Sequence, residues 1–169
     1  MVQAGGMSDR PCDKSGRLVI VCGLPGSGKT TVGAHLESAY GAIRLSPDEW
    51  MEVLGVDLFE AGTRARIERL QWQLARRLLE LRQIVVIEWG TWGRDERDVL
   101  REGARALNAN VELHFLDEPL EVLWGRVRQR DMERRLGGRP LTRADLELYA
   151  GKFQRPDARE LALYDPPLV

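Results

Sequence analysis

The sequence has few cysteines and no long hydrophobic run, and each absence excludes a class of protein. Its 169 residues include two cysteines, Cys12 and Cys22, which is too few for the disulfide framework of a secreted protein. No apolar stretch approaches the roughly 18 residues that a membrane-spanning helix needs. The first 16 residues are polar and lack the apolar stretch of a secretory signal. We therefore expect a cytoplasmic protein with no membrane partner and a flexible leader over residues 1–16.

An excess of charge of one sign is also absent. The chain has 25 Lys and Arg residues against 26 Asp and Glu residues, a net charge of −1. Dedicated nucleic-acid binders usually carry a basic field over the whole domain, so a nucleic-acid partner is disfavoured, although a local basic patch could still bind one. The hydrophobic share of 43% and the charged share of 30% are typical of a globular domain, which we place at residues 17–169.

Short apolar runs alternate with segments of helical spacing. The runs are residues 18–22, 42–45, 84–88 and 111–116, and the helical segments are 29–40, 63–82, 94–107, 119–135 and 142–153. The segment 63–82 has an apolar stripe, typical of an amphipathic helix on a core, made of Ile67, Leu70, Leu74, Leu78 and Leu81. This alternation predicts an α/β fold, with a parallel sheet of four or five strands and helices on both faces.

The stretch GLPGSGKTT follows the first run and precedes a helical segment. It fits the phosphate-loop pattern G-x-x-x-x-G-K-[ST] in the required context, so an accidental glycine-rich turn is disfavoured. The glycines let backbone N–H groups approach phosphate oxygens, while Lys29 reaches the β- and γ-phosphates and Thr30 binds Mg²⁺. The nucleotide-binding residues are predicted to be Gly23, Leu24, Pro25, Gly26, Ser27, Gly28, Lys29, Thr30 and Thr31.

Two further loops follow strands, at the sheet edge where such folds bind ligands. In SPDEW, Asp48 could accept the proton of an attacking hydroxyl, or could merely stabilise a helix start. In EWGTWGR, Glu88 could hold a water of the Mg²⁺ shell or contact the acceptor. Trp89 and Trp92 could form a ring-stacking wall of the acceptor site or could anchor the core.

Arginines are concentrated near the end of the chain. Six of them lie between residues 126 and 139, beside the Gly137–Gly138 pair. Arg126 and Arg130 share one helical face, so residues 126–141 are predicted to form a short arginine-rich helical lid that places guanidinium groups on the transferring phosphoryl group. A solvated basic face is the alternative.

These motifs together resemble the small P-loop kinases, which include gluconate kinase, shikimate kinase, chloramphenicol phosphotransferase, zeta toxin and polynucleotide 5′-kinase domains. The chain looks most similar to the AAA-type "predicted kinase" group over about residues 18–165. The resemblance implies a three-layer P-loop NTPase fold, ATP as donor, and Asp48 as catalytic base. It also implies that Arg97, and more weakly Arg94, face the acceptor, and that Lys29, Arg126 and Arg130 act in catalysis.

Two departures from the family pattern stand out. Glu88 takes the place of an aspartate, and the final strand of these kinases is not evident, because the chain ends in LALYDPPLV. The leading hypothesis is an ATP- and Mg²⁺-dependent kinase, monomeric or dimeric, that phosphorylates a hydroxyl of a small molecule. Trp50, Trp89 and Trp92 suggest an aromatic or partly apolar metabolite or antibiotic. The alternatives are a polynucleotide 5′-hydroxyl kinase and a non-kinase ATPase or nucleotide switch.

Overall fold

The fold is seen in a computed structural model that describes residues 15–133 and 140–168. The elements are β1 (Arg17–Cys22), α1 (Lys29–Tyr40), β2 (Ile43–Leu45), α2 (Pro47–Val53), α3 (Ala61–Glu80), β3 (Ile84–Gly90), α4 (Arg94–Arg105), β4 (Asn110–Phe115), α5 (Leu120–Glu133), α6 (Arg143–Lys152) and α7 (Ala158–Leu161). Almost all of the predicted leader, and residues 134–139 of the predicted lid, lie outside the described residues.

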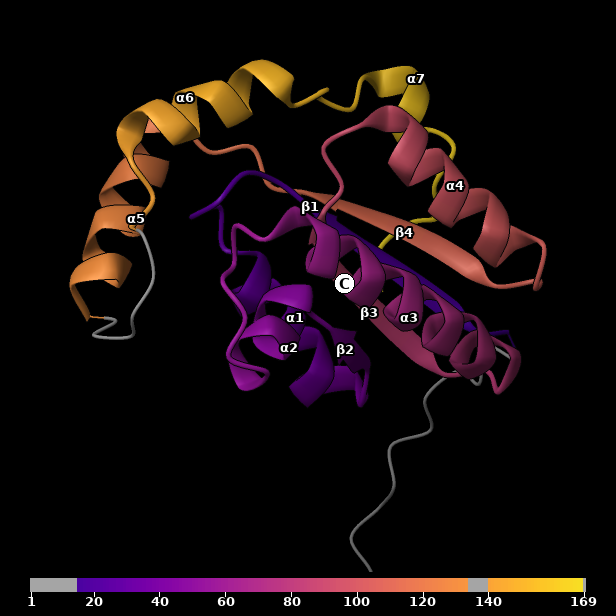
Figure 1. The fold of residues 1–169 in the computed structure, drawn as a ribbon. Coiled ribbons are helices and arrows are strands. Elements are labelled where there is room, and N and C mark those ends of the chain that lie inside the picture. The colour runs from indigo at the N-terminus through magenta and orange to yellow at the C-terminus, as the bar shows by residue number, and fades with distance from the viewer. Residues whose placement is uncertain (1–14, 134–139, 169) are drawn as a thin grey trace, which may run out of the picture.

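The described strands form one parallel sheet in the order β2-β3-β1-β4 (Figure 1). The central strand β1 pairs with β3 on one side and β4 on the other, so that Leu18 lies opposite both Val85 and Val111. The sequence predicts a sheet of four or five strands, and the sheet in the described part of the chain has four. Residues 158–161, near its end, form the helix α7.

Helices cover both faces of this sheet and confirm the three-layer α/β fold. Helices α3 and α4 pack on one face, where Ala75, Leu79 and Leu100 join the strands' aliphatic side chains. Helix α1 packs on the other face through Leu36. Both clusters are built from strand residues that are fully buried, as expected for a parallel sheet that is covered twice.

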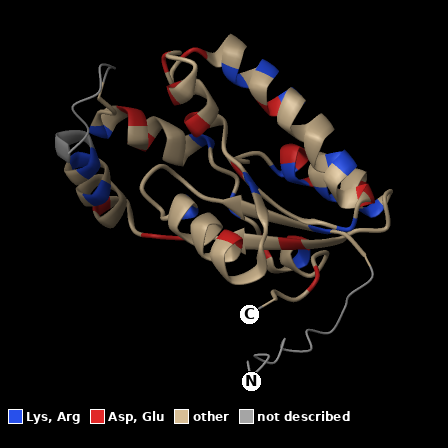
Figure 2. Cartoon of the chain, turned by 90° about the horizontal axis from the view of Figure 1, so that it is seen from below, with Lys and Arg blue, Asp and Glu red and all other residues tan. Residues whose placement is uncertain are grey.

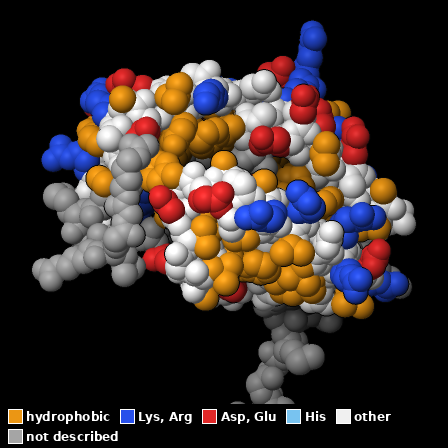
Figure 3. All heavy atoms as spheres, in the orientation of Figure 1, with side chains coloured by type: hydrophobic (Ala, Val, Ile, Leu, Met, Phe, Trp, Pro, Cys, Tyr) orange, Lys and Arg blue, Asp and Glu red, His pale blue; other side chains and the backbone are white. Residues whose placement is uncertain are grey.

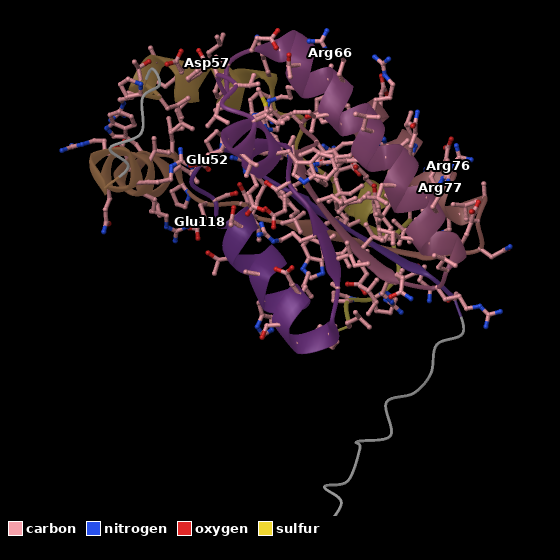
Figure 4. All side chains as sticks on the ribbon, turned by 60° about the horizontal axis from the view of Figure 1, so that its bottom comes forward. Glu52, Asp57, Arg66, Arg76, Arg77 and Glu118 are labelled. Carbon is pink, nitrogen blue, oxygen red and sulfur yellow. The ribbon has the colours of Figure 1, made fainter. Side chains whose placement is uncertain are left out.

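Helix α3 presents a different face to the core than its leucines predict. Its buried side chains are Ile67, Gln71, Ala75 and Leu79, at steps of four, whereas Leu70, Leu74 and Leu81 are exposed. The small side chain of Ala75 lets the helix lie close to the sheet. The predicted stripe was therefore wrong at those three leucines. Arg66, Arg76 and Arg77 project from the helix (Figure 4), and hydrophobic side chains lie exposed beside Lys and Arg side chains on this face of the molecule (Figure 3).

Helices α5 and α6 lie together beyond one end of the sheet (Figure 1). Leu123 of α5 and Leu146 of α6 enclose Leu24 of the glycine-rich loop in a third apolar cluster. Helix α6 begins as predicted, because Thr142 caps it by accepting a hydrogen bond from the Asp145 backbone N–H. The described part of the arginine-rich segment is thus packed directly against the loop that follows β1.

A buried ion pair joins the chain beyond α6 to helix α4. Arg97 of α4, expected to face an acceptor, is 0% exposed and forms a two-bond pair with Glu160 of α7 at 2.6 and 3.0 Å. Its other N–H groups donate to the backbone oxygens of Thr91, Trp92 and Gln154. Because other groups of the protein engage all five of its N–H donors, Arg97 has no donor left for a substrate. Its role is structural.

Among the residues that the structure describes, no helix is long and apolar enough to cross a membrane.

Replacement of Arg97 by methionine should destabilise the protein strongly, because it leaves the Glu160 carboxylate buried without its partner. We expect the free energy of unfolding, measured with urea, to fall by about 3–5 kcal/mol. The matched control is Arg143→Met, which removes an arginine from an exposed ion pair with Glu121 and should change stability little. Similar small losses in both variants would contradict the structural role of Arg97.

Candidate functional site

The glycine-rich loop after β1 forms a cradle at the start of α1. Gly26 and Gly28 have positive φ angles of 82° and 97°, which favour glycine. A Cβ atom on Gly26 would lie 2.8 Å from the backbone oxygen of Leu123, so α5 approaches the loop too closely for a side chain there. Gly28 is also the N-cap residue of α1, so the loop leads directly into the positive end of the helix.

Lys29 lies inside this loop. Its Nζ donates hydrogen bonds to the backbone oxygens of Gly23 and Leu24, at 2.9 and 3.0 Å. The Ser27 hydroxyl is buried and has no hydrogen-bond partner among the described residues. The cradle and its lysine suit the phosphate groups of a nucleotide, while the exposed Thr30 at the start of α1 offers the hydroxyl that would hold Mg²⁺.

The charge of Lys29 is perturbed by groups from three other segments. Burial lowers the pKa of Lys29 from 10.5 to about 8, and the nearby carboxylates of Asp48 and Glu88 partly oppose this shift. The positive charge of Arg130 on α5 lowers the pKa further. Three predicted site residues, from different parts of the sequence, therefore lie close enough to the Lys29 amine for their charges to interact with it.

Glu88 is held against the first turns of α1. A Cβ atom on Gly33 would lie only 1.7 Å from Glu88 Oε1, so the carboxylate occupies the space that the glycine leaves free. Arg44 of β2 places Nη1 3.4 Å from both carboxylate oxygens of Glu88 and Nη2 2.6 Å from Glu49. Burial raises the pKa of Glu88, while Arg44 opposes the shift. This acid is thus fixed on the side of the site nearest the phosphate loop.

Asp48 lies in the first turn of α2, after the N-cap Ser46 and Pro47. Its carboxylate is more than half exposed and forms an ion pair with Arg64 of α3. Asp48 is therefore a first-turn acid that remains accessible at the rim of the site. Arg64 holds its carboxylate towards α3.

The two tryptophans at the end of β3 and just after it pack into different clusters. Trp89 belongs to the core under α3 and donates from Nε1 to Gln71 Oε1 at 2.8 Å. Trp92 belongs to the cluster of Leu24, and its ring centroid lies 4.7 Å from that of Tyr149. Because both are partly buried in separate clusters, they do not form one continuous wall.

The arginines of the site differ in what they contact. Arg126 of α5 donates from Nη1 to the backbone oxygen of Gly26 at 3.3 Å and from Nη2 to Glu118 at 3.0 Å, so it reaches the phosphate loop. Figure 2 shows the positions of the basic residues along α5, the helix that runs into the grey segment. Arg94 lies along α4 instead, with Nε 3.5 Å from Asp98. The structure brings Arg126 and Arg130 to the loop, but does not bring Arg94 there.

Three residues near the site were not found from the sequence. Arg44 could have been noticed as a charged residue inside a short apolar run, and Gly33 as a glycine inside a helical segment. Arg64 had no such signal, because an arginine among the many charged residues of α3 is unremarkable. Their roles depend on contacts with Glu88 and Asp48 that only the fold creates.

Substitution of Gly33 by alanine should test the fit of Glu88 against α1. Within a helix, this change normally stabilises a protein by about 0.5–1 kcal/mol. At Gly33 we expect a lower free energy of unfolding instead, because the new Cβ would displace a carboxylate that is held by Arg44. Gly125→Ala in α5, where nothing lies within 4 Å, is the control that should stabilise. Equal gains in both variants would rule out the close contact.

Nucleotide affinity should depend on pH through Lys29. With its pKa lowered to about 8, Lys29 loses its charge in the free protein as the pH rises above 8. Phosphate oxygens favour the charged form, so AMPPNP binding above pH 8 should take up a proton and weaken as pH increases. Calorimetry in two buffers of different ionisation heat measures this uptake. Lys29→Met should lack it, and an unchanged uptake in that variant would disprove the assignment.

Solved structures that resemble this chain include two kinases and an RNA repair complex. The gluconokinase from Sinorhizobium meliloti 1021 is 22% identical, with a TM-score of 0.58 over 85% of this chain and 78% of that one. The APS kinase CysC of Mycobacterium tuberculosis, in complex with AMPPNP and APS, is 21% identical, with a TM-score of 0.60 over 84% of each chain. The Pnkp1/Rnl/Hen1 RNA repair complex is 19% identical, with a TM-score of 0.69 over 89% of this chain.

The match to the RNA repair complex covers only 47% of the matched chain in that complex. The present protein therefore spans about half the length of that chain. At these identities the likenesses establish the fold alone. None of the curated proteins that were compared with the sequence matches it. A family model described as an AAA domain, however, matches residues 18–156. The chain therefore belongs to the AAA domain family and has the P-loop kinase fold.

Proposed function

We propose that the protein is a kinase that transfers the γ-phosphoryl group of ATP to a hydroxyl group of a small molecule. The observation that carries this proposal is the position of Asp48: its carboxylate in α2 and that of Glu88 in β3 act on the Lys29 amine. A phosphate-binding cation and an accessible carboxylate therefore lie close enough for their charges to interact. This is the arrangement that phosphoryl transfer to a hydroxyl needs.

The donor end is built from the loop after β1. Lys29 and the backbone N–H groups of the loop would bind the phosphates, and the Thr30 hydroxyl would hold Mg²⁺. Bound Mg²⁺-ATP supplies the phosphoryl group together with part of the charge neutralisation that its transfer requires. Glu88 is the second residue suited to Mg²⁺, through a water ligand, because Arg44 and Gly33 hold it beside α1. This favours a metal-side role for Glu88 over a contact with the acceptor.

At the acceptor end, Asp48 would take the proton of the attacking hydroxyl. A new bond forms between the hydroxyl oxygen and the γ-phosphorus as the bond from that phosphorus to the β–γ bridging oxygen breaks. Arg64 orients the Asp48 carboxylate, while Arg126 and Arg130 on α5 bring positive charge to the transferring group. Both arginines belong to the lid predicted at residues 126–141. Helix α5, which carries them, packs on the loop and would also help to exclude water.

The tryptophans constrain the nature of the acceptor less than the sequence suggests. Trp89 and Trp92 pack in separate clusters, and the Trp89 indole N–H is already bonded to Gln71. An aromatic acceptor would therefore find no single stacking wall between them. The proposed acceptor is a hydroxylated small molecule that needs no aromatic ring.

The likeness to an RNA repair protein favours a second candidate, a kinase for the 5′-hydroxyl of a polynucleotide. The near-zero net charge argues against it, since binding of a phosphate backbone needs a basic surface. Gel-shift measurements with single-stranded RNA and DNA at low salt separate the two candidates. Stable binding would favour the polynucleotide, and its absence would favour the small molecule. A steady ATPase rate that no hydroxylated compound changes would instead favour an ATPase or nucleotide switch.

Substitution of Asp48 by asparagine should remove the base while leaving the phosphate loop intact. We expect the acceptor-stimulated rate of ADP release to fall by a factor of about 10²–10⁴, with AMPPNP affinity nearly unchanged. Glu52→Gln, which changes an exposed acid one turn along the same helix (labelled in Figure 4), should keep full activity. Full turnover in Asp48→Asn would refute the assignment of the base.

A further inference from the structure

A file of polar side chains runs along one face of α3, from the rim of the site into the core. Arg64, Glu68 and Gln71 lie four and then three residues apart, so they share a helical face. Arg64 and Glu68 each keep 28% of their side-chain surface exposed, whereas Gln71 is fully buried. The file starts at Asp48, which pairs with Arg64, and ends at Trp89, which bonds to Gln71. It therefore connects the proposed base with the end of β3.

The inner end of the file has an unused hydrogen-bond donor. Gln71 Oε1 accepts the Trp89 indole N–H at 2.8 Å, but Gln71 Nε2 has no partner among the described residues although it is buried. Leaving a buried amide N–H group unpaired is unfavourable, and such a group needs an explanation. Because the oxygen of the amide is engaged by the protein, the NH₂ group is the end that a ligand oxygen could satisfy.

The middle of the file carries more negative charge than the protein neutralises. Glu68 Oε1 lies 3.8 Å from Arg64 Nη1, but Arg64 also pairs with Asp48 through Nη2. Burial raises the pKa of Glu68, Arg64 opposes this shift, and the carboxylates of Glu96 and Asp48 raise the pKa further. Three carboxylates thus act on the same region as one guanidinium group. A cation placed beside Glu68 would balance this charge, whereas an anion would be repelled.

We propose that the acceptor is a hydroxylated molecule that carries an ammonium group, such as an amino alcohol or an amino sugar. Glu68 is then the specificity-determining residue that binds the ammonium group, and Gln71 donates its free N–H to an oxygen of the same molecule. The acceptor hydroxyl lies towards Asp48 at the outer end of the file. This inference rests on the proposed kinase function, because it names the acceptor class of that site.

The experiment compares probes that share a hydroxylated skeleton and differ in charge. One set is glucosamine, glucose and glucuronate, and the other is ethanolamine, ethylene glycol and glycolate. Binding to the full chain in the presence of AMPPNP is followed by tryptophan fluorescence, and ADP release is measured with ATP. We expect the amino member of at least one set to bind about tenfold or more tighter than its neutral relative. A tighter anionic or neutral member, or no binding by either amino compound, overturns the proposal.

The variant Glu68→Gln should abolish the preference for the amino probe while AMPPNP affinity stays the same. The control is Glu80→Gln, an exposed acid on the outer side of the same helix, which should keep the preference. An unchanged preference in Glu68→Gln, with a normal melting temperature, would also overturn the proposal.

The two readouts separate this inference from the function on which it rests. If an amino probe binds through Glu68 but never stimulates ADP release, the acceptor class stands as a ligand class and the kinase function is wrong. If a neutral or anionic probe stimulates ADP release best, the kinase function stands and the inference about the ammonium group is wrong.

Discussion

The walls of the site depend on one buried guanidinium group. Arg97 uses all five of its N–H donors, two on Glu160 and three on the backbone oxygens of Thr91, Trp92 and Gln154. A buried charge of this kind is tolerated only when every donor is satisfied, so the loop after β3 and the segment after α6 must keep their relative positions. The third apolar cluster, which encloses Leu24 of the phosphate loop, includes Trp92 and Phe153 from these two segments.

Within the site, a second arginine contacts glutamates, and this contact positions the candidate acids. Arg44 joins Glu88 of β3 to Glu49 of α2, and it therefore links the two elements that carry the candidate acids. Gly33 makes this possible, because any larger side chain on α1 would occupy the place of the Glu88 carboxylate. The donor end of the site is thus rigid on two sides, while Asp48 remains exposed at the rim.

What could be predicted from the sequence was mainly local. The phosphate loop and the helix at 29–40 follow from neighbouring residues, and α1 has those same bounds. The inner face of α3 was mispredicted, since leucine content does not reveal that Ala75 and Gln71 provide closer packing than Leu70 and Leu74. Arg97 was misplaced for a related reason: its partner Glu160 lies 63 positions away, and nothing near either residue in the sequence indicates the pair.

This contrast explains why the structure constrains the proposed donor end better than the proposed acceptor end. The proposed donor end is made largely of backbone N–H groups whose positions follow from a short glycine pattern. The acceptor end is made of side chains from α2, α3 and the loop after β3, where a single substitution changes the charge without changing the fold. The proposal about the acceptor therefore rests on residues such as Glu68 and Gln71, whose charge and unpaired donor are properties of this chain rather than of its architecture.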